Sequence, residues 1–242
     1  MTAPNSFAGP NRRTVAVIQA RMGSSRLRGK VLLPFGNQTI LMYLVRRLER
    51  ARTIDGIVVA TSTSPDDDVI VEECRRHEVR FFRGSEPDVL GRYAGAAQAS
   101  DADIVVRVTA DNPFTDPDSI DRVVNHILLT DVGYALESRL PTGTTGEALT
   151  RDTLNYLDTV SDDYRLREHV TLYAKEHLEE TNGVFLAPRP EVDCPNLRLT
   201  VDEFVDYLWA KEVRRGLEEQ GHGIDFSLST LIEAASHLTA AA

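Results

Sequence analysis

Short apolar runs alternate along the chain with longer segments in which apolar residues recur every three or four positions. The short runs are rich in β-branched residues and predict strands, buried on both faces, at 15–20, 57–61, 79–83 and 104–109. The periodic segments predict amphipathic helices with apolar stripes at 40–48, 69–77, 89–97 and 120–128. This alternation predicts an α/β fold, with a mostly parallel sheet covered by helices on both faces.

The alternation weakens between about residues 137 and 195. There we expect turns at 140–145, helices at 151–160 and 165–178, and a short strand at 184–187. A returning strand at 197–201 and helices from 204 and over 228–238 follow. We expect a disordered tail over 1–13. Because no repeat or low-complexity linker interrupts the rest of the chain, we expect a single domain over 14–242, with an elaborated arm at about 137–195.

Composition and charge narrow the classes of function. Apolar residues make up 42% and charged residues 26% of the 242 positions, as in ordinary globular proteins. The formal charge of -10 argues against a nucleic-acid partner or an anionic membrane surface. No apolar run has the length of a membrane span or of a signal peptide. Two cysteines without metal-type spacing fit a reducing compartment, so we expect a cytoplasmic protein.

A cluster of cations at residues 21–30 stands against this acidic background, directly after the first predicted strand. Its charged residues are Arg21, Arg26, Arg28 and Lys30, and its small residues are Gly23, Ser24, Ser25 and Gly29. Guanidinium and ammonium groups on a glycine-rich loop at the carboxyl end of a parallel strand are suited to a triphosphate. The spacing matches neither a P-loop nor a dinucleotide fingerprint, and a solvated basic loop is the alternative.

Two aspartates follow predicted strands at the same edge of the sheet. Asp111 lies in T-A-D-N-P after the strand at 104–109, and Asp202 lies in L-T-V-D-E after the strand at 197–201. Carboxylates at the ends of parallel strands could share one Mg²⁺, which takes its remaining ligands from substrate phosphates. The alternatives are a turn aspartate at Asp111 and a helix N-cap at Asp202.

Three D-x-D patterns bear on a glycosyltransferase, an enzyme class that uses this pattern to hold a metal. Asp101 and Asp103 precede their predicted strand and so lie at the wrong end of the sheet. The run at 66–68 falls in the first turn of a helix, and the pair at 116 and 118 falls in a turn and N-cap. This placement disfavours a glycosyltransferase.

Several segments, in order along the chain, resemble the signature of the cytidylyltransferase family. They read V-I-Q-A-R-M-G-S-S-R-L-R-G-K-V-L, I-V-V-A-T-S, F-R-G-S-E-P-D-V-L-G-R-Y, I-V-V-R-V-T-A-D-N-P, R-E-H-V-T and L-R-L-T-V-D. The likeness covers most of the chain from Thr14 onward and is closest to the SpsF-like branch, named for spore coat polysaccharide biosynthesis. CMP-ketodeoxyoctonate and CMP-sialate synthetases are more distant relatives.

The resemblance implies a three-layer α/β/α sandwich of the nucleotide-diphospho-sugar transferase (Rossmann-like) type. It implies Mg²⁺-dependent transfer of CMP from CTP to a small phosphorylated or sugar-acid acceptor, with release of pyrophosphate, by a homodimer. The implied CTP-binding residues are Ala20, Arg21, Gly23, Ser24, Arg26 and Lys30 at the triphosphate and Ala60, Thr61, Ser62, Arg83 and Gly84 at the cytosine. Asp111 and Asp202 would bind Mg²⁺ and would be catalytic together with Arg21 and Lys30, and Glu147, Arg167 and His169 would lie toward the acceptor.

The chain departs from the family pattern in three places. Residues 27–30 read L-R-G-K where L-P-G-K is common, residues 143–147 read G-T-T-G-E in place of G-L-D-V-E, and residues 203–206 read E-F-V-D in place of T-P-E-D. These changes leave the acceptor open. A glycosyltransferase of related fold and a non-catalytic nucleotide-binding protein remain as alternatives, and the presence of both Asp111 and Asp202 argues against the second.

Overall fold

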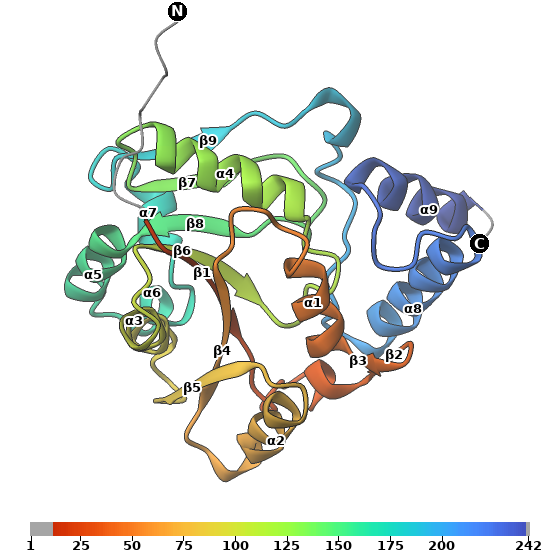
Figure 1. Cartoon of the computed structure of the whole chain (residues 1–242), viewed down its shortest axis with the longest axis horizontal. Coiled ribbons are helices and arrows are strands. Elements are labelled where there is room, and N and C mark those ends of the chain that lie inside the picture. The colour runs from red at the N-terminus through yellow and green to blue at the C-terminus, as the bar shows by residue number, and fades with distance from the viewer. Residues whose placement is uncertain (1–11, 241–242) are drawn as a thin grey trace, which may run out of the picture.

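Seven strands form one sheet in the computed structural model, which describes residues 12–240, so the predicted tail lies outside the described residues as far as residue 11. Their order across the sheet is β5-β4-β1-β6-β8-β7-β9 (Figure 1). The strands are β1 (Thr14–Gln19), β4 (Gly56–Ser62), β5 (Arg80–Gly84), β6 (Ile104–Thr109), β7 (Tyr134–Glu137), β8 (Glu147–Thr150) and β9 (Gly183–Leu186). Strands β5, β4, β1 and β6 are parallel, and β8 runs antiparallel to both of its neighbours.

Helices cover both faces of this sheet, as the apolar pattern predicts (Figure 1). They are α1 (Ile40–Leu48), α2 (Asp68–Arg76), α3 (Val89–Ala99), α4 (Pro117–Leu129), α5 (Arg151–Val160), α6 (Tyr164–Glu168), α7 (Leu172–Glu176), α8 (Phe204–Glu219) and α9 (Leu228–Ala240). Because successive strand residues point to opposite faces, Ala16 and Ile18 pack on the side of α1, α2 and α4, while Val15 and Val17 pack on the side of α3, α5 and α7. The predicted α/β/α layering is confirmed.

A further apolar cluster joins α8 and α9 to the edge of this sandwich. It includes Phe35 from the small hairpin of β2 (Pro34–Phe35) and β3 (Gln38–Thr39). Phe35 meets Tyr43 and Phe114 edge-to-face, with ring centroids 4.8 and 5.8 Å apart. Leu199 and Val201 are buried in the same cluster, so it holds the segment before α8 close to the chain that follows β6.

The segment predicted as an arm differs from expectation. It contributes β8 and β9 to the main sheet, and β7 and β8 are strands that the apolar pattern does not reveal. The strand predicted at 197–201 is absent: the chain there is extended, but it forms only an isolated bridge between Thr142 and Arg198. Two backbone hydrogen bonds of 2.8 Å join it to Thr142, from Thr142 N to Leu197 O and from Leu199 N to Thr142 O. Because Thr142 alone faces the segment, no ladder of backbone hydrogen bonds can form, and the segment is not a strand.

The helix predicted at 165–178 is two short helices, α6 and α7. Val170 lies between them at a φ of 39°, a left-handed conformation that β-branched residues rarely adopt. Its side chain is fully buried against the α3 face of the sheet. Burial of Val170 therefore interrupts the helix and places His169 at its end.

Candidate functional site

The cationic loop after β1 is fixed by a buried carboxylate. Asp67 is 2% exposed, and its Oδ1 accepts the Met22 N–H at 2.7 Å while its Oδ2 accepts the Ser62 hydroxyl at 2.5 Å. At the far end of the loop, Gly29 has a φ of 70° and donates its N–H to Met22 O at 3.0 Å. That conformation favours glycine, so the sequence closes the loop at this point. The short helix η1 (Lys30–Leu32) follows.

Lys30 brings the two predicted metal ligands together. Its Nζ donates to Asp111 Oδ2 at 2.7 Å, to Asp202 Oδ1 at 2.9 Å and to Val201 O at 2.8 Å, and the residue is only 8% exposed. Since both carboxylates contact one nitrogen, their oxygens cannot be farther apart than these two distances combined. Two aspartates separated by 91 positions in the sequence thus share one cation at the edge of the sheet.

Asp202 carries the densest charge pairing of this cluster. Arg26 contacts its Oδ1 at 2.9 Å, and Arg198 contacts its Oδ2. Burial alone would raise the pKa of Asp202, but the hydrogen bond from Lys30 and the charges of Lys30, Arg26 and Arg198 hold it below its usual value. Asp202 is therefore an anion whose charge is balanced by residues from the loop and from the segment before α8.

The alternative structural role of Asp202 is not supported. The N-cap of α8 is Glu203, which forms a capping box with Asp206. Asp206 Oδ2 accepts the N–H groups of Asp202 at 2.9 Å and of Glu203 at 2.8 Å. The Asp202 carboxylate is consequently free to face Lys30. Asp111 is held through its backbone, because its carbonyl accepts the Val201 N–H at 2.8 Å.

A cavity of about 290 Å³ opens beside these groups at the carboxyl ends of β1 and β6. Its lining residues are Gln19, Arg21, Ser24, Ser25, Arg26, Lys30, Val31, Arg107, Thr109, Ala110, Asp111, Glu168, His169 and Asp202. The predicted triphosphate side chains, both predicted metal ligands and one predicted acceptor residue thus meet in one cavity. Ligands of parallel α/β sheets bind at this end of the strands.

The residues predicted around the cytosine lie together but outside the cavity lining. Thr61 pairs with Arg83, and Ser62 with Gly84, along β4 and β5. Ala60, Thr61 and Ser62 are fully buried. The Arg83 guanidinium donates to the carbonyl oxygens of Ser62 and Ser64 at 2.8 and 3.0 Å and pairs with Asp68, so it braces the chain after β4.

Two of the three predicted acceptor residues are engaged elsewhere. Arg167 donates to both oxygens of Asp88, at 2.8 and 2.9 Å, and contacts Asp158 at 2.7 Å. Glu147 is 4% exposed and lies behind the cavity, where Lys175 and Thr171 contact its carboxylate. Only His169 lines the cavity.

Arg107 is a cavity residue that the sequence does not single out. It lies in β6, lines the cavity and approaches Glu147 at 3.7 Å. Burial would lower the pKa of Arg107, but the Glu147 carboxylate raises it, so the guanidinium stays charged. A cation in the middle of the apolar run I-V-V-R-V-T is the signal that could have found it.

Glu168 and Asp67 were also missed as site residues. Glu168 lines the cavity and pairs with Arg21 at 2.9 Å. Asp67 is in the acidic run 66–68, which is indistinguishable in sequence from an ordinary helix start. Only the fold reveals that its side chain turns back to the loop at Met22.

The Asp111–Asp202 pair fits a divalent cation by the chemistry of its donors. Carboxylate oxygens from two chain segments already enclose a positive nitrogen, that of Lys30. Over residues 12–240 no group of three or more acidic, histidine or cysteine side chains is placed to hold a metal. A pair of carboxylates is what Mg²⁺ uses when substrate phosphates supply other ligands.

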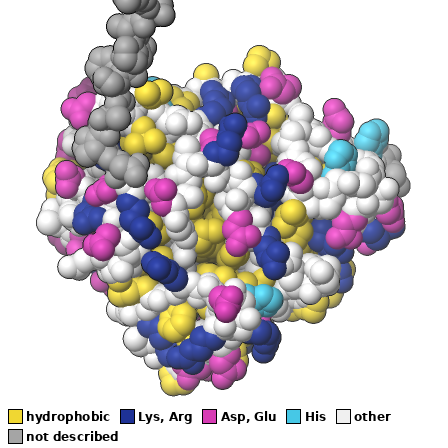
Figure 2. Space-filling model, in the orientation of Figure 1, with side chains coloured by type: hydrophobic (Ala, Val, Ile, Leu, Met, Phe, Trp, Pro, Cys, Tyr) yellow, Lys and Arg dark blue, Asp and Glu magenta, His cyan; other side chains and the backbone are white. Residues whose placement is uncertain are grey.

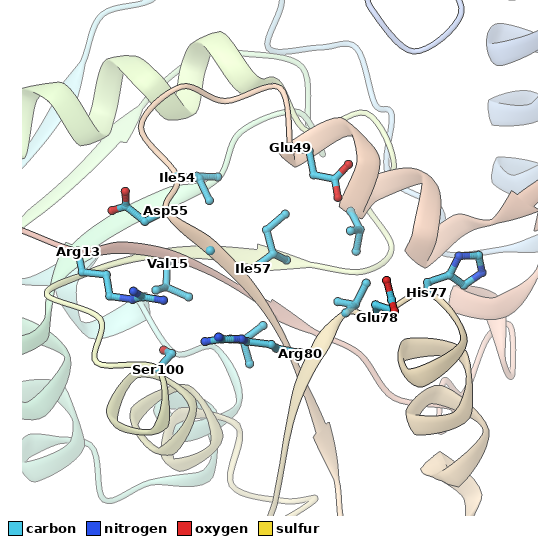
Figure 3. Close-up of a pocket in the computed structure, with 14 residues that line it drawn as sticks. Arg13, Val15, Glu49, Ile54, Asp55, Ile57, His77, Glu78, Arg80 and Ser100 are labelled. Carbon is cyan, nitrogen blue, oxygen red and sulfur yellow. The ribbon is translucent and has the colours of Figure 1, made fainter.

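A larger cavity of about 440 Å³ lies at the opposite, amino end of the strands (Figure 3). Arg13 and Arg80 extend into it from the starts of β1 and β5, and Asp55 at its rim accepts the Thr14 N–H at 2.8 Å. It contains none of the predicted site residues, and this end of a parallel sheet is not where ligands usually bind. On the face seen in Figure 2, acidic and basic side chains are interspersed, with no broad basic patch.

Comparisons with known proteins show the family to which the chain belongs. A family model described as cytidylyltransferase matches residues 15–229. The chain belongs to the cytidylyltransferase family. It is similar to the spore coat polysaccharide biosynthesis protein SpsF of Bacillus subtilis (strain 168), with 34% identity over 223 residues that cover 89% of this chain and 91% of the relative.

Solved structures of cytidylyltransferases share this fold. A cytidylyltransferase from Leptospira borgpetersenii serovar Hardjo-bovis is 31% identical, with a TM-score of 0.85 over 95% of this chain and 96% of the other. CMP:2-keto-3-deoxy-manno-octonic acid synthetase, solved with CTP, is 15% identical, with a TM-score of 0.64 over 86% and 99%, and shows the fold alone. The predicted family, fold type and enzyme class, a CTP-dependent nucleotidyltransferase, are confirmed. Among residues 12–240, no helix combines the length and apolarity that a bilayer crossing requires.

Proposed function

We propose that this cytidylyltransferase transfers CMP from CTP to a small phosphorylated or sugar-acid acceptor, releases pyrophosphate and depends on Mg²⁺. The observation that carries the proposal is the meeting of Asp111 and Asp202 at Lys30, beside the cationic loop. The name of the relative SpsF supports a role in polysaccharide biosynthesis. The solved complex of a synthetase of the same fold with CTP supports the choice of nucleotide.

The cations of the loop bind the triphosphate in this proposal. Arg21 and Arg26 line the cavity, with side chains 32% and 56% exposed, so both can turn toward a ligand. Lys30 neutralises the pyrophosphate that leaves when the acceptor oxygen attacks the α-phosphorus in line. The backbone at Gly23 and the Ser24 hydroxyl add donors to the phosphates. These positions stabilise the transition state through charge and placement, as in phosphoryl transfer generally.

Asp111 and Asp202 would hold Mg²⁺, which supplies Lewis-acid stabilisation of charge on the α-phosphate when it is bound. The two carboxylates that would hold the ion come from different chain segments, one after β6 and one before α8. As a triphosphate enters, Lys30 leaves the carboxylates for the phosphates, because two cations cannot share the space between them. The protein thus keeps its own cation in the site until substrate arrives.

An anionic acceptor is favoured by Arg107, a cation at the cavity outside the cationic loop. Arg107 and His169 line the cavity and are not among the predicted triphosphate ligands. Arg107 is charged, and a phosphate or carboxylate on the acceptor can pair with it. An acceptor that already carries a phosphate needs no strong general base.

We also propose a cytoplasmic homodimer. The outer edge strand β9 lies in the predicted arm, and its Phe185 is 43% exposed, so an apolar side chain is open to contact there. The two cysteines are both free. Burial raises the pKa of Cys74 to about 12, which suits an inert thiol in a reducing compartment.

The test is pyrophosphate release from each of the four nucleoside triphosphates, measured against a panel of phosphorylated and sugar-acid acceptors. Of the four nucleotides, only CTP should give pyrophosphate, in amounts equal to the CMP-acceptor product. Chelation of divalent cations should stop the reaction. Sugar transfer from a nucleotide sugar without pyrophosphate release would contradict the proposal. That outcome is not favoured, because Asp103 of the D-A-D motif lies at the amino end of β6, where its carboxylate accepts the Arg13 N–H.

A further inference from the structure

A buried arginine with an unused donor edge lies behind the cationic loop. Arg92, on α3, is 1% exposed. Its Nη1 donates to the carbonyl oxygens of Ser85 and Glu86 at 2.6 and 2.7 Å. Its Nε and Nη2 have no hydrogen-bond partner among the described residues. Buried donors without partners destabilise a fold, so the unused edge of Arg92 is open to a further partner.

An unused acceptor of opposite charge lies in the same layer. Glu168 Oε1 pairs with Arg21 Nη2 at 2.9 Å, while Glu168 Oε2 is buried without a partner in the described chain. Glu168 is the last residue of α6, and α6 packs on α3. Burial lowers the pKa of Arg92 and Arg21 lowers it further, whereas Tyr93, Glu168 and Asp67 raise it, so the Arg92 guanidinium is within electrostatic reach of both partners of this ion pair.

Nucleotide binding disturbs this arrangement if Arg21 serves the triphosphate. Glu168 lines the same cavity as Arg21, and its side chain is only 16% exposed. When Arg21 turns to the phosphates, the Glu168 carboxylate loses its partner and faces a polyanion. An unpaired carboxylate in a partly buried site destabilises the protein, and it also repels the bound anion.

We propose that Arg92 is a positioning residue, whose free edge takes the Glu168 carboxylate when a triphosphate draws Arg21 into the cavity. The two hydrogen bonds from Nη1 keep the guanidinium in place, and the edge that carries Nε and Nη2 donates side-on to the carboxylate oxygens. Arg167 on the same helix as Glu168 has no such capacity, because Asp88 and Asp158 already occupy it. This inference rests on the proposed function for the role of Arg21.

The experiment measures binding of CTP and of inorganic tripolyphosphate, each with Mg²⁺, by titration calorimetry. Arg92→Met should weaken both affinities at least about tenfold, since a charge-assisted pair is lost in the bound state. Glu168→Gln in the same chain should restore them to the affinities of Glu168→Gln alone, because a neutral amide needs no cation. The matched control Arg165→Met, which removes a cation of α6 that pairs with Glu176, should leave both affinities unchanged.

Wild-type affinity in Arg92→Met, or weak binding that Glu168→Gln does not restore, would overturn the exchange. If Arg92→Met does not fold, a structure of the wild-type protein with CTP decides the question: Glu168 should then contact Arg92, and a retained Arg21–Glu168 pair refutes the exchange. A wild-type protein that binds neither probe also refutes it. Binding of both probes with the expected mutant pattern, but no pyrophosphate from any nucleotide, would refute the proposed function and support the exchange.

Discussion

Two clusters of opposite charges lie near the cavity and differ in where their cations come from. In the first, Asp111 and Asp202 are balanced by Lys30 and Arg26 of the cationic loop. In the second, Glu147 is balanced by Arg107 of β6 and by Lys175 of α7. The carboxylate side chains of the first cluster, Asp111 and Asp202, are 25% and 16% exposed, whereas that of Glu147 is 6% exposed.

The difference separates an exchangeable cluster from a fixed one. In the proposed function, loop cations move to a phosphate and leave the two aspartates to a metal ion, so the first cluster would exchange its partners. Cations on a strand and a helix are held by the fold, so the second cluster fixes Arg107 at the cavity wall. Breaking the first should therefore abolish activity without unfolding the protein, and breaking the second should lower stability.

The largest expected effect is on catalysis. Asp111→Asn removes half of the carboxylate pair and should lower pyrophosphate release about a thousandfold or more, because a metal ion at the reacting phosphate supplies several kcal/mol. Thermal unfolding should change little, since Asp202 still pairs with Lys30. Asp66→Asn is the matched control, because Asp66 pairs with Arg28 on the surface. Activity in Asp111→Asn within tenfold of wild type would break the distinction.

The fixed cluster should show its effect in stability. Glu147→Gln leaves Arg107 and Lys175 without a balancing charge and should lower the free energy of unfolding by about 3 kcal/mol. Urea unfolding measures this loss. Glu176→Gln, at the exposed partner of Arg165, should change it by less than about 0.5 kcal/mol. Equal effects of the two substitutions would mean that Glu147 is not part of a buried, fixed network.

A third buried pair sharpens the comparison through its pH dependence. Burial raises the pKa of Asp116 to about 6, although Arg47 at 3.6 Å and the Ser119 N–H oppose the shift. Because the folded state binds this proton more tightly than the unfolded state, its contribution is complete below about pH 4 and is lost as the pH rises through 6. Asp116→Asn keeps the N-cap of α4 and should gain about 2 kcal/mol relative to wild type between pH 4 and pH 7. Urea unfolding across this range with a constant difference would contradict the shift.

The smallest effect separates two arginines of the same loop. Arg26 lines the cavity and pairs with Asp202, whereas Arg28 pairs with Asp66 at the surface, with side chains 74% and 60% exposed. Arg26→Ala should raise KM for CTP about tenfold through loss of a charge-assisted contact. Arg28→Ala should leave KM and stability nearly unchanged. Steady-state kinetics at varied CTP checks both, and similar KM values for the two variants would remove Arg26 from the site.

The parallel half of the fold could be predicted from sequence because its strands are apolar on both faces. Runs such as I-V-V-R-V-T are typical of buried parallel strands. The glycines and cations after β1 predict the loop that follows it. The convergence of Asp111 and Asp202 was also predictable, although Asp202 follows an extended segment and not a strand. The prediction for Asp202 depends only on where the extended segment ends, and it does not require that segment to pair as a strand.

The missed features depend on long-range contacts. Strands β7 and β8 are only four residues each, Y-A-L-E and E-A-L-T, and their short patterns do not separate a strand from a turn. The break at Val170 arises from burial against α3, which no local signal reports. Asp67 acquires its role through Met22, a residue 45 positions away.

The measurement that tests the central claim most directly is the dependence of CTP affinity on Mg²⁺, determined by calorimetry for the wild-type protein and for Asp202→Asn. If the two aspartates exchange Lys30 for a metal ion, wild-type affinity should rise steeply with added Mg²⁺. In Asp202→Asn that dependence should be largely lost, while tripolyphosphate without metal still binds the loop. Equal Mg²⁺ dependence in the two proteins would contradict the claim.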